Sequence, residues 1–214
     1  FGSRGCIKPD ATGFEQFCCD CDSCMSMLTH PDIESCLFST QEIQHRIQEL
    51  GAQITDENPS GSTPLLVVGV LTGCFVFMGD LVRQIALPTE IDFVQCSSYG
   101  ASTISSGEIV MKKDLSTDPA GRDIIVVEDI IDTGLTLQTL CENLMSRGAK
   151  SVKVCALLDK SCRRKAMRVG DFCKYIGFDC PDEFVVGYGI DYAEKYRNLP
   201  WVGSLKRSIY EKVS

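Results

Sequence analysis

The sequence predicts an α/β protein whose centre is a doubly wound, mostly parallel sheet. Apolar runs, rich in Val, Ile and Leu, lie at residues 65–71, 124–127 and 151–158, the last with Ser151 and Lys153 near its start. Such runs are typical of strands that are covered on both faces. Each of the first two runs leads through a short turn into a helical repeat, at residues 75–85 and 137–147. This alternation of strand and helix favours parallel strands joined by crossover helices.

The composition is that of one globular domain with room for a small accessory lobe. The chain has 214 residues, of which 44% are hydrophobic and 23% charged, which is ordinary for a folded domain. A net charge of −8 argues against a nucleic-acid-binding surface. No apolar run is long enough to cross a bilayer, and the first residues carry no hydrophobic signal segment. We therefore expect no nucleic-acid partner, no membrane partner and a cytoplasmic location.

The chain is rich in cysteine. It has 13 cysteines, and this odd number favours reduced thiols over a disulfide scaffold. Six of them lie in the first 36 residues. Cys21 and Cys24 have the spacing of half a zinc site, which His30 and either Cys18 or Cys36 could complete. The alternative is an N-terminal extension with incidental reduced cysteines.

Before the first apolar run, a helix is expected from the capping box of Ser39 and Glu42 to about Thr55. After the helix at 75–85, strands are expected at residues 91–96 and 108–113. The Ser/Gly-rich stretch between these strands is either a plain hairpin connection or, given its length, a functional lid.

Acidic residues follow the central run directly. Because an unpaired charge is very costly in an apolar interior, Glu128 and Asp129 are expected at the carboxyl end of the strand, where open α/β sheets bind ligands. Asp132 comes three residues later, and Thr133-Gly-Leu-Thr136 precedes the helical repeat. Small residues at a helix start offer free N–H groups and a positive dipole to an anion.

This combination predicts a sugar-phosphate site. The hydroxyls of Thr133 and Thr136 suit a terminal phosphate, and the adjacent acids suit two ribose hydroxyls or a Mg²⁺ ion bound to them. The stretch has neither the Gly-Lys-Ser/Thr ending of a nucleotide P-loop nor a G-x-G-x-x-G pattern. The alternative is that these residues merely end a strand and cap a helix.

Two later segments carry further candidates. Asp159 and Lys160 end the run at 151–158, on the same edge of the sheet as the acids, and Lys160 could also be an exposed strand end. After a strand at 173–178, the block at 184–192 begins with an aromatic residue, which could be a core residue or a ligand contact.

The sequence Val-Glu-Asp-Ile-Ile-Asp-Thr-Gly at 127–134 resembles the phosphoribosyl-pyrophosphate motif of the type I phosphoribosyltransferases. The stretch from about residue 40 to residue 205 resembles the hypoxanthine-guanine members of that family. The resemblance implies the type I phosphoribosyltransferase fold with a small hood lobe. Residues 1–36 differ in character from the rest and are expected to be a Cys-rich N-terminal extension. The resemblance implies a phosphoribosyltransferase domain at residues 37–214, with the hood mainly at 171–200.

The resemblance implies an activity in purine salvage. A 5-phosphoribosyl group would pass from phosphoribosyl pyrophosphate to N9 of hypoxanthine or guanine, with xanthine as an extra substrate to test, giving IMP or GMP and pyrophosphate. Mg²⁺ would be the cofactor, and the enzyme would be a homodimer or homotetramer. One alternative is a phosphoribosyltransferase for a pyrimidine or adenine. Another is a non-catalytic regulator of the same fold that senses phosphoribosyl pyrophosphate; retention of all three acids argues against it.

The resemblance also assigns roles around the acids. Asp132 would be the catalytic acid/base partner at N7 of the base. Glu128 and Asp129 would bind the ribose hydroxyls and metal, and Asp191 would be a further metal ligand. The 5-phosphate would be bound by Asp132, Thr133, Gly134, Leu135 and Thr136.

For the purine base, the resemblance points to Lys160, Phe184, Val185 and Asp191. Lys160 would donate to the 6-oxo group, which selects against adenine because an amino group would face a buried donor. Phe184 would stack on the base, and the backbone around Val185 would read its N1/N2 edge.

For pyrophosphate, the resemblance implies contacts from Leu71, Thr72, Gly73, Ser98, Tyr99 and Arg197, with a cis peptide bond before Thr72. Here the chain departs from the family, which commonly has Lys at the position of Thr72 and Gly at the position of Cys74. Without that cation, the contact would fall to backbone N–H groups and Mg²⁺.

Overall fold

The computed structural model describes residues 7–9, 15–17, 30–58, 63–98, 109–166 and 168–211. In chain order the elements are β1 (Ile7–Pro9), β2 (Glu15–Phe17), β3 (Ile33–Phe38), α2 (Thr40–Glu57), β4 (Leu65–Leu71), α3 (Phe75–Val82), β5 (Thr89–Ser98), β6 (Ile109–Lys113), β7 (Asp123–Ile131), α4 (Leu135–Ser146), β8 (Ser151–Asp159), η1 (Ser161–Arg163), η2 (Val169–Asp171), β9 (Cys173–Asp179), β10 (Val185–Val186), β11 (Val202–Leu205) and α5 (Arg207–Tyr210). None of the described helices is both long and apolar enough to cross a bilayer.

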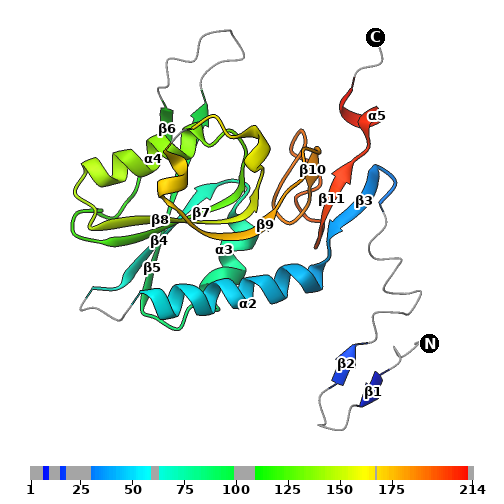
Figure 1. The fold of residues 1–214 in the computed structure, drawn as a ribbon, viewed down its shortest axis with the longest axis horizontal. Helices are drawn as coiled ribbons and strands as arrows, with labels where there is room; N and C mark the ends of the chain where they lie inside the picture. The colour runs from blue at the N-terminus through cyan, green and yellow to red at the C-terminus, as the bar shows by residue number, and fades with distance from the viewer. Residues whose placement is uncertain are drawn as a thin grey trace.

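The main sheet has six strands in the order β6-β5-β4-β7-β8-β9. In Figure 1 this sheet lies between α4 and α2. Its strands run parallel except for β6, which is antiparallel to β5. From the central pair the chain winds outward in both directions, from β4 through α3 to β5 and from β7 through α4 to β8. This confirms the doubly wound, mostly parallel α/β fold. The switch point between β4 and β7 leaves a crevice at the carboxyl ends of both strands, where such sheets bind ligands.

Each face of the sheet is covered by helices, because alternate residues of the apolar strands point to opposite sides. On one face α2 and α3 pack on side chains such as Val67 and Ile125, and on the other α4 packs on Val68 and Ile124. The capping box predicted at the start of α2 is present: the Ser39 amide donates to Glu42 Oε2 at 2.8 Å, and the Glu42 amide donates to Ser39 Oγ at 3.3 Å.

Some element bounds differ from the prediction. β7 does not end at the acids but continues to Ile131, whose side chain is 1% exposed and returns to the α4 side of the core. Glu128 and Asp129 lie inside the strand and both keep part of their surface exposed. α3 ends at Val82 rather than at residue 85. After Val82 the backbone tightens into a three-residue turn, in which the amide of Gln84 donates to the carbonyl of Leu81.

A second sheet of three antiparallel strands, in the order β10-β11-β3, forms the hood beside the main sheet (Figure 1). Its small apolar cluster contains Ile33, Val186, Trp201 and Leu205. The hood sheet therefore differs from the segment expected at 171–200, since β9 belongs to the main sheet while β3 and β11 come from outside that segment. The domain boundary expected after residue 36 falls within β3.

Several predictions lie outside the described residues. They concern Tyr99, most of the Ser/Gly-rich stretch at 97–107, and the zinc candidates Cys18, Cys21 and Cys24. The roles expected for these residues stay predictions.

Candidate active site

Three segments meet at the switch point. The turn after β4 begins with a cis peptide bond between Leu71 and Thr72, as the resemblance implied. A Cβ atom placed on Gly73 would lie 1.7 Å from Asp129 Oδ2 on β7. On the hood, a Cβ atom on Gly189 would lie 2.1 Å from the carbonyl oxygen of Gly73. The backbone of Gly73 is thus enclosed between the acids and the hood, which only residues without side chains allow.

The two adjacent acids of β7 are electrostatically strained. Burial raises the pKa of Glu128 well above its ordinary value, and the neighbouring charge of Asp129 raises it further. Burial also raises the pKa of Asp129, although the Ile130 amide and the charge of Arg197 partly oppose this shift. A carboxylate pair that is costly to ionise without a partner is suited to a cation or to hydroxyl donors brought by a ligand.

The phosphate turn follows β7. Gly134 has φ +76° and caps α4, whose first residue is Leu135. The backbone behind the turn is held because the carbonyl of Thr133 accepts hydrogen bonds from the amides of Lys165 at 2.9 Å and Ala166 at 3.0 Å. The open side faces a hollow of about 160 Å³, lined by residues that include five of the predicted anion and ribose contacts: Glu128, Asp132, Thr133, Gly134 and Thr136. The first N–H groups of α4 have no partner within the helix and point toward its N-terminal end.

A larger pocket of about 340 Å³ lies between β7, the end of β8 and the hood. The predicted residues Asp132, Lys160, Phe184, Val185 and Asp191 all line it. The structure therefore brings together the residues that the sequence assigned to the base and to acid/base chemistry, although they are up to 59 positions apart.

Lys160 is buried, with 6% of the residue exposed. Its Nζ donates to the carbonyl oxygen of Glu183 at 2.6 Å, immediately before Phe184. An ammonium group has three donors, so Lys160 keeps capacity for a ligand acceptor in the pocket. The alternative of an exposed strand end is therefore wrong.

Phe184 is 38% exposed, so the alternative of a core aromatic is also wrong. Its ring meets the edge of Tyr192 at a centroid distance of 5.2 Å and stacks on Tyr210 at 4.9 Å. Val185 is fixed behind it in β10, paired with Ser204 of β11.

Arg197 ties together the hood segment at residues 189–194, and its charge acts on Asp129 of β7. Its Nη2 lies 2.8 Å from Asp191 Oδ1 and 3.0 Å from Glu194 Oε2, and its Nη1 donates to the carbonyl of Gly189 at 2.9 Å. Asp191 is held from its other side by the amide of Glu194 at 2.9 Å. This network places a planar cation beside the Gly73 turn, where the sequence has no lysine.

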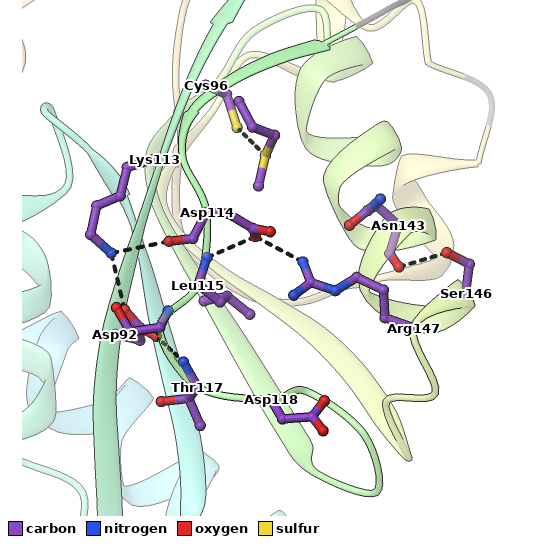
Figure 2. Close-up of polar contacts among 12 residues, drawn as sticks. Asp92, Cys96, Lys113, Asp114, Leu115, Thr117, Asp118, Asn143, Ser146 and Arg147 are labelled. Atoms are coloured by element: carbon purple, nitrogen blue, oxygen red, sulfur yellow. Dashed lines mark hydrogen bonds and ion pairs between the residues drawn. The ribbon is translucent and has the colours of Figure 1, made fainter.

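The strand pair that carries Ser98 is anchored at its far end, as Figure 2 shows. Asp92 is 6% exposed and accepts hydrogen bonds from Lys113 Nζ at 3.2 Å and from the Thr117 amide at 2.9 Å. Arg147, at the end of α4, lies 2.8 Å from Asp114. The connection from β6 to β7 is thereby tied to both β5 and α4. Ser98 is the last residue of β5, and Tyr99 lies beyond the described residues.

Sequence reasoning missed some residues of the site. Arg163 lines the base pocket, with its Nη1 3.5 Å from Asp132 Oδ2 and its Nε 3.0 Å from Asp182. Ile130 forms part of the pocket wall, and alternation along β7 could have indicated it. Tyr210 also lines the pocket, and nothing in the local sequence pointed to it.

Among the described residues, no group of three or more His, Cys, Asp or Glu side chains is arranged to hold a metal ion. Glu128, Asp129 and Asp191 therefore do not form one closed metal site. The donor set nevertheless fits Mg²⁺, because this ion is commonly held by one or two carboxylates together with substrate oxygens.

The comparisons with known proteins agree with this geometry. The phosphoribosyl transferase domain family matches residues 36–193. The hypoxanthine-guanine phosphoribosyltransferase of Bacillus subtilis is 52% identical over 185 residues, covering 86% of this chain and 99% of that protein. The enzyme of the same name from Staphylococcus epidermidis is 45% identical over 184 residues, with the same two coverages. A crystal structure of a hypoxanthine phosphoribosyltransferase from Staphylococcus aureus has a TM-score of 0.80 at 44% identity, covering 86% of this chain and 97% of that one.

These relatives carry the names of enzymes, so they give no support to a non-catalytic regulator. The family match at residues 36–193 includes the acid pair, the phosphate turn and the pocket residues Lys160, Phe184, Val185 and Asp191. The chain therefore belongs to the hypoxanthine-guanine phosphoribosyltransferase family, whose reaction is a pentosyl transfer in purine salvage.

Proposed function

We propose that this protein transfers the 5-phosphoribosyl group of phosphoribosyl pyrophosphate to N9 of hypoxanthine or guanine, giving IMP or GMP and pyrophosphate. The observation that carries the proposal is the single pocket lined by Asp132, Lys160, Phe184, Val185 and Asp191. It opens beside the acid pair of β7, since Ile130 and Asp132 line both this pocket and the smaller hollow of the phosphate turn.

The base is proposed to bind between the end of β8 and the hood. Lys160 donates to the 6-oxo group, which disfavours adenine because its amino group would face a buried donor. The half-exposed ring of Phe184 supplies a stacking surface, and the backbone around Val185 reads the N1/N2 edge. Xanthine is a further candidate, since residues near Asp191 read the purine 2-position.

The phosphoribosyl group is proposed to span the two hollows. The 5-phosphate accepts hydrogen bonds at the turn of residues 132–136, and its fixed position orients the reacting carbon. Glu128 and Asp129 accept from the two ribose hydroxyls.

Pyrophosphate is proposed to leave along the turn at Leu71, Thr72 and Gly73, next to Arg197. The Arg197 guanidinium, held by Asp191 and the Gly189 carbonyl, compensates in part for Thr72 at the common lysine position. Ser98 and Tyr99 are proposed to close over pyrophosphate and keep water from the sugar cation.

Mg²⁺ is the proposed cofactor, with Glu128, Asp129 and Asp191 as the residues that hold it together with substrate oxygens. Bound there, it would neutralise charge that develops on the leaving group. The raised pKa values of the acid pair support this role, because a cation relieves the cost of their ionisation.

Asp132 is proposed to hold the proton of the base at N7 as N9 attacks C1 of the ribose. Its Oδ1 is buried and has no hydrogen-bond partner among the described residues, so an acceptor is kept free at the pocket. A buried acceptor of this kind is expected to find its partner in a ligand.

The organisation of the chain is part of the proposal. Residues 1–36 are proposed as a Cys-rich extension whose last residues begin β3 of the hood, and residues 37–214 as the phosphoribosyltransferase domain. The family match at residues 36–193 supports a domain that starts near residue 36. We further propose a homodimer or homotetramer located in the cytoplasm.

The test is a direct assay with Mg²⁺, phosphoribosyl pyrophosphate and each of five bases: hypoxanthine, guanine, xanthine, adenine and orotate. Nucleotide formation with hypoxanthine and guanine, and none with adenine or orotate, is the expected result. Turnover of xanthine would widen the substrate range. Preference for adenine or orotate would contradict the roles given to Lys160 and Phe184.

A further inference from the structure

Tyr210 is the last aromatic residue of the chain, and it lies beyond both the recognised motifs and the family match at residues 36–193. Its ring stacks on that of Phe184, with a centroid distance of 4.9 Å and an interplanar angle of 24°. Both rings line the base pocket. The residue proposed to stack on the purine therefore already has an aromatic partner.

Packing indicates which side of Phe184 this partner takes. Tyr210 packs against the hood cluster of Ile33, Val186, Trp201 and Leu205. Ile130, which forms part of the pocket wall, packs against the separate core under α2 and α3. Tyr210 is thus on the hood side of the ring, while Phe184 keeps 38% exposure and borders a pocket of about 340 Å³.

The segment that carries Tyr210 is fastened to the hood. The amide of Lys206 donates to the carbonyl of Asp32 at 2.9 Å, and its Nζ donates to the carbonyl of Pro31 at 2.6 Å. The amide of Leu205 donates to the carbonyl of Phe184 itself at 2.7 Å. These bonds tie the backbone just before Tyr210 to the residues that precede β3 and to Phe184. They keep Tyr210 close to Phe184.

We propose that Tyr210 is a positioning residue for the base site: it holds the Phe184 ring at a fixed angle so that the exposed face is ready for the purine. The edge contact from Tyr192, at 5.2 Å and 88°, restrains the ring from a second direction. A ring that is ordered before binding loses less rotational freedom when the base arrives. The inference rests on the proposed function, because Phe184 is given its role there.

The test compares Tyr210→Ala, Tyr210→Leu and Tyr210→Phe with the wild-type protein and with Arg207→Ala. Arg207 is the matched control, because it lies on the same short helix, is exposed, and does not line the base pocket. KM and kcat are measured separately for hypoxanthine, guanine and phosphoribosyl pyrophosphate, and thermal unfolding reports the fold of each variant.

The Ala and Leu variants are expected to raise KM for both bases about tenfold, the order of an aromatic pair contribution. KM for phosphoribosyl pyrophosphate is expected to stay unchanged, and Tyr210→Phe and Arg207→Ala to behave like wild type. If Tyr210→Ala does not fold, the comparison of Tyr210→Leu with Tyr210→Phe carries the same contrast.

Unchanged KM for the bases in folded Ala or Leu variants would overturn the inference. A lower KM would also overturn it, because it would mean that Tyr210 competes with the base for Phe184. An equal loss toward phosphoribosyl pyrophosphate would reduce Tyr210 to a general packing role. A wild-type protein that converts no base would instead overturn the proposed function, and this inference with it.

Discussion

Gly73 and Asp129 are in such close contact that a methyl group on the Gly73 Cα would lie 1.7 Å from the Asp129 carboxylate. The contact joins the turn after β4 to the acids of β7, across the switch point of the sheet. The Asp129 side chain is also held by the amide of Ile130 at 2.9 Å. The position of this carboxylate therefore depends on the absence of a side chain in the neighbouring turn.

Gly73→Ala is expected to lower kcat/KM about 100-fold, because it displaces a carboxylate proposed to position the ribose. The matched control is Gly79→Ala, since a Cβ atom there would meet nothing within 4 Å and Gly79 lies inside α3. The control is expected to keep full activity and to stabilise the protein by about 0.4–1 kcal/mol. Steady-state kinetics and denaturant unfolding of both variants check the pair, and wild-type kinetics in Gly73→Ala would show that Asp129 can move without consequence.

Glu128→Gln is expected to stabilise the ligand-free protein at neutral pH. Because the pKa of Glu128 is raised in the folded protein, the unfolded chain releases this proton at a lower pH than the folded one. Stability is therefore lost as pH rises from the ordinary carboxyl range through the folded pKa. Glu128→Gln removes this loss, so at pH 7–8 its free energy of unfolding should exceed that of the wild type by about 0.5–2 kcal/mol. The difference between the two proteins should shrink toward pH 4.

Urea unfolding at several pH values measures this effect, with the exposed Glu34→Gln as control. The same Glu128 variant should bind phosphoribosyl pyrophosphate with Mg²⁺ more weakly, since one of its proposed ligands has lost its charge. A variant less stable than wild type at pH 8 would contradict the burial argument. If Glu128→Gln is more stable than the wild type but binds phosphoribosyl pyrophosphate more weakly, then Glu128 lowers the stability of the protein while it contributes to ligand binding.

Most of the fold could be predicted because it depends on local patterns. The apolar run of β4 and the capping box of α2 each carry their own signal and were placed at the right residues. The extent of β7 was underestimated, because rules about buried charge do not foresee two partly exposed acids inside a strand. The hood was the least predictable part, because β3 and β11 are short and far apart in sequence, and β3 joins the hood sheet only through its pairing with β11.

The candidate site was predictable where chemistry and spacing coincide, as at Glu128, Asp129 and Asp132. Lys160 and Phe184 were indicated by resemblance, and the structure adds that both line one pocket. Tyr210 and Arg163 were not found. Both act through tertiary contacts, a ring stack and an ion pair, that no local pattern records.

Lys160→Met is expected to raise KM for hypoxanthine and guanine roughly 10- to 100-fold, the size of a lost charge-assisted hydrogen bond. Discrimination against adenine should weaken in the same variant, because the buried donor that opposes the adenine amino group is gone. Lys165→Met is the control, since this side chain is exposed, and the bond of Lys165 to the Thr133 carbonyl comes from its backbone amide, which the substitution keeps. Competition of adenine with hypoxanthine gives the readout, and unchanged discrimination would remove Lys160 from base selection.

Asp92→Asn is expected to destabilise the protein by about 1–3 kcal/mol, because a nearly buried carboxylate accepts bonds that an amide cannot all replace. Burial raises the pKa of Asp92, but the amides of Phe93 and Thr117 and the Lys113 ammonium together hold it below its ordinary value. For a depressed pKa, the stabilisation is present above the ordinary carboxyl pKa and is lost as pH falls through the folded value. The gap between wild type and variant should thus be full at pH 7 and close in strong acid, while the exposed Asp118→Asn shows none.

Asp132→Asn is expected to slow turnover about 10²- to 10⁴-fold, the range of a general acid/base contribution, with little loss of phosphoribosyl-pyrophosphate binding. The amide keeps the size of the side chain but no longer accepts a proton. Arg163→Ala is the informative control, because it removes the cation 3.5 Å from Asp132 Oδ2 and leaves the carboxylate in place. Should proton transfer at N7 be the role of Asp132, only the Asn variant loses kcat. A parallel loss of phosphoribosyl-pyrophosphate affinity would assign Asp132 to the phosphate turn, and wild-type rates would remove it from the mechanism.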